Sequence, residues 1–415
     1  MSLRVLLSLA MALLAACNSA GGARAPVVGT APNTVGTWVN ITPPTYWALM
    51  QANNVYPSSG SYSMTGIGLS PSAPATLYAS TVRGNGLFKS TDGGNSWAGP
   101  IGTTFLNVNG TTHTQGNPWT TGAGTSWTIA VDPLDANTVY AFSAFGGDQG
   151  PWKTTDGGNT WRGMFSSADN SAMTPDIYAI AVDPNNHQHL LITFHSPWNY
   201  TANAGILESV DGGATFIKHY PVAMGGAVPD SGAGHYAFFL GRKNDGTVDA
   251  SGKFWIFATQ GNGFWRTEDG GTTWTEVASG YNMQHGAGGL YRASTGVLYM
   301  GAVRHLLRST DNGRTWTLAG EPPTGSGLDD FLHDGYNAVI GDGVTMFVMP
   351  ANTGYHTNGA PTPYYYSSET DGTHWTQYGN QTFYDGPGWM AADAVNHVIY
   401  SSNWAAGLWR LETGH

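Results

Sequence analysis

Short apolar segments alternate with polar turns along nearly the whole chain, and the apolar segments have the length of β-strands. Segments such as WTIAVDP (Trp127–Pro133) and YAIAVDP (Tyr178–Pro184) are rich in small and β-branched residues, and each ends in an Asp-Pro turn signal. A second strand, a loop and a hairpin follow each of them. The pattern therefore predicts a series of antiparallel sheets, each small enough to form one blade of a larger β-structure.

A short motif closes each of these units, and its copies are called the repeat turns below. They follow the pattern S/T-x-D-x-G-x-x-W/F, except that the last copy has Thr370 where the others have Asp. The copies are Ser90–Trp97, Thr154–Trp161, Ser209–Phe216, Thr267–Trp274, Ser309–Trp316 and Ser368–Trp375. Carboxylate and hydroxyl oxygens can accept hydrogen bonds from a turn's N–H groups, and Gly permits positive φ. We therefore interpret the Asp residues of the motif as turn-forming groups and not as catalytic acids.

The two ends of the repeat region each carry a strand without a repeat turn. Trp38, in GTWVNIT, lies in what reads as a final strand with no motif before it, and GLWRLETGH (407–415) reads as a strand with no motif after it. The economical interpretation is that the N-terminal strand completes a sheet begun at the C-terminus. Six repeat turns and this shared sheet predict an all-β fold, a single seven-bladed β-propeller over residues 36–415. Closing the ring removes exposed sheet edges.

Composition narrows the function classes. The chain has 415 residues, of which 10% are charged and 58 are Gly, which excludes a helical bundle, and 41% hydrophobic residues exclude disorder. A net charge of −11 argues against a nucleic-acid or anionic-membrane partner. We expect a monomer with no cofactor and no metal.

The N-terminus predicts export. Residues 1–16 combine Arg4 with an apolar run of signal-peptide length, too short to span a membrane. The run ends in Leu14-Ala15-Ala16-Cys17, which resembles the lipobox of bacterial lipoproteins and implies lipidation of Cys17, the only cysteine. Residues 17–35 would then be the lipidated Cys and a flexible linker. The alternative is an ordinary cleaved signal with an incidental Cys. The expected location is a membrane-anchored lipoprotein or an extracellular protein.

The repeat turns resemble the Asp-box, or BNR repeat, of sialidases, xyloglucan-cleaving glycoside hydrolases and sortilin-type receptor domains. This resemblance implies a propeller whose repeat turns lie away from the ligand face. The R-I-P signature of sialidases is absent. Xyloglucan-cleaving relatives often read Y-A-R-T-D-x-G-G in their first blade, with the Asp as general base, whereas YASTVRGNG has Val82 and Arg83 there. Those enzymes also use two propellers.

Propellers bind ligands at the axial mouth, so the long loops are the place to look for a site. The longest expected loops are Pro43–Ser61, Gly102–Thr125, His195–Ala204, Tyr281–Gly286, Gly325–Gly335 and Ala351–Pro363. Candidate catalytic residues on mouth-facing segments are His195, His285, Tyr355, Asp330, Asp334 and Asp385. Candidate substrate-binding residues are Arg83, Arg304, His305, His356, Trp47, Trp119, Trp198 and Trp404. Aromatic rings stack on pyranose faces, while imidazole and guanidinium groups bond hydroxyls or carboxylates.

Three functions fit this inventory. Asp330 or Asp334 with Asp385 would give a paired-carboxylate glycoside hydrolase. His and Tyr as base and acid, with Arg or His neutralising a uronate, would give a polysaccharide lyase, as in propeller-shaped polysaccharide lyases. The alternative is a non-catalytic glycan-binding or protein-assembly propeller. The preferred prediction is a secreted or surface-anchored protein that cleaves a polysaccharide or oligosaccharide at the mouth.

Overall fold

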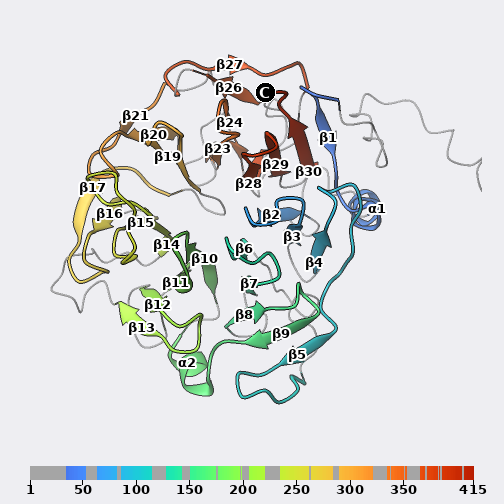
Figure 1. Cartoon of the computed structure of the whole chain (residues 1–415), viewed down its shortest axis with the longest axis vertical. Coiled ribbons are helices and arrows are strands. Elements are labelled where there is room, and N and C mark those ends of the chain that lie inside the picture. Colours follow the sequence, from blue (N-terminus) through green and yellow to red (C-terminus); the bar gives the residue numbers. More distant parts are fainter. Residues whose placement is uncertain are drawn as a thin grey trace, which may run out of the picture.

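A computed structural model gives the architecture of the chain (Figure 1). The described residues are 34–52, 63–81, 86–114, 128–142, 150–173, 176–196, 198, 205–219, 234–260, 263–283, 289–320, 334–336, 338–349, 351–352, 365–369, 372–381, 383, 386–403 and 406–415. Apart from a two-stranded ladder of β22 and β25, they form seven sheets arranged around one axis, each with its first strand innermost, so the predicted seven-bladed propeller is confirmed.

The first four blades follow one another along the chain. Blade 1 has β2 (Met64–Leu69), β3 (Leu77–Thr81) and β4 (Leu87–Ser90). Blade 2 has β6 (Ala130–Val131), β7 (Val139–Phe142), β8 (Pro151–Thr154) and β9 (Thr160–Gly163), with β5 (Thr104–Leu106) added outside β9. Blade 3 has β10 (Ile177–Asp183), β11 (Asn186–Phe194), β12 (Ile206–Ser209) and β13 (Ile217–His219). Blade 4 has β14 (Gly234–Phe239), β15 (Trp255–Thr259), β16 (Phe264–Thr267) and β17 (Thr275–Ala278).

The last three blades complete the ring. Blade 5 has β18 (Leu290–Arg292), β19 (Leu298–Ala302), β20 (His305–Ser309) and β21 (Thr317–Leu318). Blade 6 has β23 (Val339–Gly341), β24 (Met346–Val348), β26 (Tyr366–Ser368) and β27 (Thr376–Gln377). Blade 7 has β28 (Pro387–Asp393), β29 (Val398–Asn403), β30 (Gly407–Glu412) and β1 (Trp38–Asn40). The remaining elements are α1 (Pro44–Ala52), α2 (Ser167–Ala172), β22 (Asp334–Gly335) and β25 (Ala351–Asn352).

Blade 7 is shared between the two ends of the chain, as the sequence predicts. The N-terminal strand β1 pairs antiparallel with β30, with Trp38 opposite Leu411 and Asn40 opposite Trp409. In Figure 1 the blue β1 lies beside the red β30. The indole of Trp38 is 5% exposed and stacks on Tyr365 of blade 6, with ring centroids 4.1 Å apart. The closing strand therefore binds both its own blade and the neighbouring one.

The repeat turns have the predicted internal chemistry. In the first copy the Ser90 hydroxyl donates to Asp92 at 2.8 Å, and Asp92 accepts from the Ser96 N–H at 2.8 Å. Burial disfavours ionisation of Asp211 in the third copy, but hydrogen bonds from Thr215, Ser209 and Ala214 outweigh it and lower its pKa to about 2. These carboxylates are saturated with turn donors, which confirms their structural role.

A second interaction joins neighbouring blades, and in blades 1, 2 and 4 it lies directly before the repeat turn. A cationic side chain on the third strand donates to the backbone carbonyl of the residue after the motif Asp in the next blade. These inter-blade cation contacts are Lys89 to Gly157 at 3.2 Å, Lys153 to Gly212 at 3.0 Å, Arg266 to Asn312 at 3.1 Å and Arg410 to Gly93 at 2.8 Å. The last contact crosses the closure of the ring.

Blade 1 departs from the four-stranded pattern. After its repeat turn the chain makes one bridge, Lys89 with Ala98, and then continues to β5, which pairs in parallel with β9 of blade 2. Pro100 has no N–H to donate to β4, and one further hydrogen bond, from the Ile101 N–H to the Leu87 carbonyl at 2.8 Å, ends the contact with that strand. The segment that would complete blade 1 therefore extends the outer edge of blade 2.

Candidate ligand site at the axial mouth

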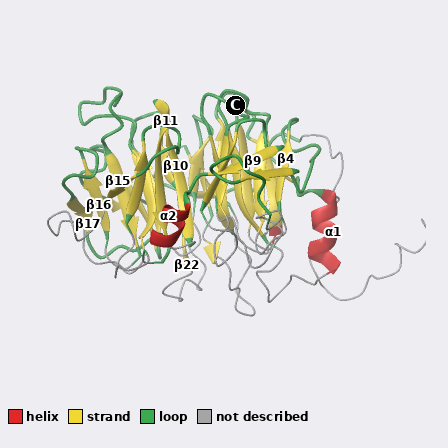
Figure 2. Cartoon of the chain, turned by 90° about the horizontal axis from the view of Figure 1, so that it is seen from below, coloured by secondary structure: helices red, strands yellow, loops and turns green. Residues whose placement is uncertain are grey.

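The two faces of the ring differ in what the strands place there. Each innermost strand begins at one face, called the mouth face, and ends at the other, where the repeat turns also lie. Figure 2 shows α1, α2 and β22 on the lower side of the ring, which is the mouth face, because these elements lie in connections that lead to innermost strands. The described start of one predicted ligand loop, His195 after β11, belongs to this face.

His195 and an acidic partner form the best-defined polar site on the mouth face. Asp176 directly precedes β10, and His195 directly follows β11, so the pairing of these strands brings them together. The Nδ1 of His195 lies 2.8 Å from Oδ2 of Asp176, which also accepts from the Ser196 hydroxyl at 2.6 Å. Asp176 is 7% exposed, whereas 23% of the His195 side chain is exposed.

This geometry orients the imidazole. A carboxylate that accepts from Nδ1–H fixes the neutral ring in the tautomer whose Nε2 is the basic nitrogen. The ring also stacks on Tyr178, with centroids 5.4 Å apart and planes at 23°. His195 is therefore held from two directions, at the end of a strand, in the way that a proton-transfer residue requires.

An aromatic path leads from His195 toward the axis. Tyr178 packs against Tyr236 at 5.4 Å, and Tyr236 packs against Trp389 of blade 7 at 6.0 Å. Tyr236 and Trp389 line a cavity of roughly 190 Å³ between the innermost strands, and burial raises the pKa of Tyr236 well above its usual value. The other lining residues are Thr128, Ile129, Ala179, Ile180, Ala181, Val182, Ala237, Phe238, Phe239 and Leu290.

The cavity is smaller than the pockets of roughly 300–1,000 Å³ that hold drug-sized ligands. Its lining is also mostly apolar.

The other predicted residues within the described part have varied surroundings. Trp47, on α1, is 6% exposed, and Trp198 is 2% exposed with its ring against Phe194, so both indoles pack inside the protein. Arg304 has a φ of 63° in the turn before β20, and His305 lies edge-on to Tyr281 at 5.5 Å.

Asp334 belongs to β22, where its backbone pairs with Asn352, but the position of its side chain is not described. Nine further predicted residues lie outside the described residues: Cys17, Arg83, Trp119, His285, Asp330, Tyr355, His356, Asp385 and Trp404.

His195 was among the residues that the sequence predicted for the site, whereas the residues that hold it were not. Asp176, Ser196 and Tyr178 were not among the candidates. Asp176 and Tyr178 stand at the start of the innermost strand of blade 3, in PDIYAIAVDP, next to the loop that enters that strand. A polar residue immediately before an innermost strand is therefore a usable signal for the mouth.

Two searches of the described residues bear on metals and membranes. Within those ranges no group of three or more His, Cys, Asp or Glu side chains could hold a metal ion. Across the same part of the chain, no helix has the length and apolarity needed to cross a membrane.

Comparison with known proteins relates this ring to xyloglucanases. No family model matches. A xyloglucanase of Paenibacillus sp. is 28% identical over 256 residues, which cover 51% of this chain and 22% of that protein. The crystal structure of the GH74 xyloglucanase from Xanthomonas campestris has a TM-score of 0.61 at 18% identity, over 91% of this chain and 54% of that one.

A second solved structure matches the size of the ring as well. YCF48 from Cyanidioschyzon merolae has a TM-score of 0.51 at 13% identity, over 90% of this chain and 97% of that one. At such identities the two solved structures show the propeller fold alone. This chain spans under a quarter of the length of the Paenibacillus relative.

Proposed function

We propose that the chain is an exported carbohydrate-active protein that cleaves a polysaccharide or oligosaccharide at the mouth of the propeller. The observation that carries this is the His195–Asp176 pair, an oriented imidazole at the face where propellers bind ligands. Sequence similarity to a xyloglucanase over half of the chain makes hydrolysis of a glycosidic bond the first candidate reaction. The repeat turns then belong to the Asp-box class.

Each residue of the pair has a distinct role in this proposal. Neutral His195 accepts a proton through Nε2, and Asp176 stabilises the imidazolium that forms, since its carboxylate accepts from Nδ1–H. Tyr178 sets the plane of the ring by stacking. Predicted mouth residues outside the described part, such as Asp330, Asp385 and Arg83, would supply carboxylates and contacts to the sugar.

The second candidate reaction is β-elimination on a uronic-acid polysaccharide. The same pair favours it, because a neutral imidazole can remove the proton next to a uronate without a carboxylate base. A hydrolase produces new reducing ends alone, whereas a lyase also produces an unsaturated uronate that absorbs in the ultraviolet.

Export follows from the N-terminus in this proposal. Residues 1–16 are the signal peptide, Cys17 carries the lipid, and residues 17–35 link it to the propeller. A Cys17→Ser variant should leave the membrane fraction for the soluble fraction. Retention in the membrane fraction would contradict the anchor while leaving the mouth site untouched.

The function is tested by incubating the protein with a panel of neutral and acidic polysaccharides, including xyloglucan. New reducing ends and ultraviolet absorbance are measured for each polysaccharide. His195→Ala should lower kcat by about 10²–10⁴-fold, the typical contribution of a proton-transfer residue. Asp176→Asn should lower kcat less and shift the pH profile.

His374→Ala is the matched control, because His374 is an exposed histidine in a repeat turn on the opposite face. Binding without turnover by the unaltered protein would leave a glycan-binding propeller and overturn the proposal.

A further inference from the structure

The first described residues of the chain lie on the face opposite the mouth, which is called the repeat-turn face below. Thr34 and Gly36 precede β1, and the Gly36 N–H donates to the carbonyl of Glu412 at 2.8 Å, where β30 ends. In Figure 2 the C-terminus lies at the upper edge of the ring, on the side opposite α2 and β22. The propeller is therefore connected to Cys17 from this face.

Three exposed valines surround that connection. Val35 is 59% exposed, Val344 in the turn from β23 to β24 is 55% exposed, and Val395 in the turn from β28 to β29 is 80% exposed. The two turns touch, since a Cβ on Gly343 would lie 4.0 Å from Cβ of Ala394. The three side chains belong to the outer ends of blades 6 and 7 and are called the aliphatic patch below.

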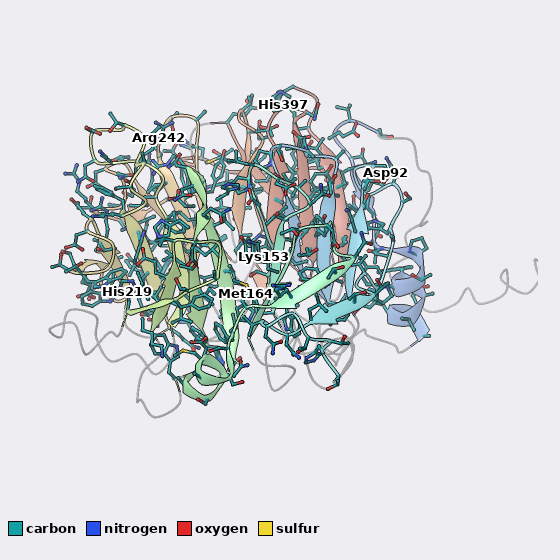
Figure 3. The ribbon with its side chains drawn as sticks, turned by 60° about the horizontal axis from the view of Figure 1, so that its bottom comes forward. Asp92, Lys153, Met164, His219, Arg242 and His397 are labelled. Atoms are coloured by element: carbon teal, nitrogen blue, oxygen red, sulfur yellow. The ribbon has the colours of Figure 1, made fainter. Side chains whose placement is uncertain are left out.

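The segment after β30 joins the parts of the aliphatic patch. The Thr413 hydroxyl donates to Oδ2 of Asp342 in the turn of blade 6, and the Thr413 N–H donates to the carbonyl of His397 in blade 7 at 3.0 Å. A Cβ on Gly414 would lie 2.3 Å from Cγ1 of Val35, so Gly414 is in contact with that valine. Figure 3 shows His397 at the upper edge of the molecule. The three valines therefore surround one short segment.

Buried carboxylates shape the two turns and direct their valines outward. Asp342 is fully buried, and its Oδ1 accepts from the Val344 N–H at 2.8 Å. Asp393 is 5% exposed, and its Oδ1 accepts from the Val395 N–H at 3.1 Å. Each carboxylate thus lies beneath its turn, while the valine two residues later lies in solvent.

The exposed surface around the valines carries no charged side chain among the described residues. Its residues are Thr, Val, Gly, Ala, Asn and His, in 34–37, 343–344, 394–396 and 414–415. An apolar surface without Lys or Arg fits an uncharged apolar layer. The net charge of −11 makes a zwitterionic lipid surface the expected one, since an anionic surface would repel the chain.

We propose that the aliphatic patch lies against the bilayer in which the lipid on Cys17 is anchored, so that the mouth points away from the membrane. This inference rests on the lipid anchor proposed above. Sixteen residues separate Cys17 from Thr34 and reach at most about 60 Å, which keeps the repeat-turn face near the bilayer. Three valine side chains hold fewer carbons than one acyl chain, which by itself binds membranes only marginally. The patch therefore orients an anchored protein and does not replace the anchor.

Spin labelling of the full lipidated chain in phosphatidylethanolamine–phosphatidylcholine vesicles tests this orientation. The lipid occupies the thiol of Cys17, the only native cysteine, so a single introduced cysteine takes the nitroxide. On vesicles, labels on Val344→Cys and Val395→Cys should gain access to oxygen relative to a water-soluble nickel complex by several-fold, compared with the same labels in the unlipidated Cys17→Ser chain. Oxygen concentrates in the acyl region, whereas the nickel complex stays in water.

Two matched controls accompany these labels. Ala168 is exposed on α2, on the mouth face, so a label on Ala168→Cys should keep the accessibility that it has in buffer. Val344→Asp should return the label on Val395→Cys toward its buffer value while the chain stays on the vesicles, because a carboxylate disfavours an apolar layer. Val248→Asp is the control for that change, since Val248 is 52% exposed on the same face in blade 4 and should leave the label unaffected.

The possible results separate the orientation from the other proposals. A vesicle-bound chain whose labels at Ala168 and Val395 respond equally would overturn the orientation and leave the anchor intact. Spin–spin broadening at Val395 would show a second copy of the chain on the patch and would also overturn it. Failure of the chain to associate with vesicles would overturn the anchor and the orientation together, while the polysaccharide assays decide cleavage at the mouth independently.

Discussion

At the scale of single residues, Glu208 of blade 3 departs from the cation that precedes the repeat turn in several other blades. It occupies the position that Lys89, Lys153 and Arg266 occupy in blades 1, 2 and 4, directly before the repeat turn. A carboxylate cannot donate to a carbonyl, and here it accepts from His189 and His219 instead, each at 2.8 Å. Blade 3 thus has a buried ion-pair cluster where blades 1, 2 and 4 have an inter-blade cation contact.

The charges of this cluster make stability depend on pH. Burial works against ionisation of both groups, but hydrogen bonds and opposite charges raise the pKa of His189 to about 9 and lower that of Glu208 to about 2. The Glu208 contribution is complete above the unfolded pKa of 4.5 and is lost as pH falls through about 2. The His189 contribution is complete below 6.5 and is lost as pH rises through about 9.

We therefore expect the thermal midpoint to be highest between the two unfolded pKa values, 4.5 and 6.5, and to fall on either side. Glu208→Gln should weaken this dependence and destabilise the protein by about 3 kcal/mol, because it removes one of the two carboxylates beside the buried His189 imidazolium and leaves only Asp183, at 3.6 Å. Calorimetry across the pH range measures both effects. An unchanged pH profile in Glu208→Gln would contradict the assignment.

At the scale of elements, the inter-blade cation contacts connect sheets that share no ladder. Lys153 of β8 crosses to the Gly212 carbonyl of blade 3 while its ammonium lies 5.3 Å from the centre of the Tyr140 ring. Burial lowers its pKa, and the charges of Asp132 and Asp211 oppose that shift. A half-buried ammonium with these partners stabilises the seam between blades 2 and 3.

Lys153→Met keeps the apolar stem of this contact and removes the charge. We expect a loss of roughly 1.5–3 kcal/mol in the free energy of unfolding, the range for hydrogen bonds to charged groups. Lys243→Met is the control, since that lysine is exposed. Equal stability of the two variants in urea titrations would show that the contact is dispensable.

The sequence predicts elements well where neighbouring residues specify them, and poorly where an element depends on contacts with distant residues. The repeat turns are local, and their Ser, Asp and Gly residues specify the hydrogen bonds in the motif itself. The segment Pro43–Ser61 reads as a loop, yet it begins with α1, whose Tyr46 and Met50 are fully buried. That helix depends on tertiary packing, and β5 depends on a parallel partner more than fifty residues away, Thr160.

At the scale of the whole molecule, closure of the ring rests on β1. A chain lacking residues 1–42 would lose β1 and the Trp38–Tyr365 stack while keeping every strand from β2 onward. It would expose the edge of β30, so we expect association in size-exclusion chromatography and a broadened thermal transition. A chain lacking residues 1–33 is the matched control and should behave as the full propeller. Identical behaviour of both would contradict closure by β1.

The candidate site was harder to predict than the ring. Trp47 and Trp198 are of the residue type that stacks on sugars, but both are buried. Sequence alone does not distinguish an exposed aromatic residue of a loop from one that packs beneath the loop. His195 was a candidate, and its partner Asp176 is nineteen residues earlier in the chain. Only the antiparallel pairing of β10 with β11 brings those two positions together.

The order in which the chain is made gives the shared blade a consequence for folding. Among the described strands β1 is translated first, yet its partner β30 is translated last: the hydrogen bond from the Leu408 N–H to the Thr42 hydroxyl joins residues 366 positions apart. During synthesis β1 therefore cannot pair with β30 until almost the entire polypeptide has followed it. Their pairing is a long-range docking event, slowed by the entropy of joining such distant segments.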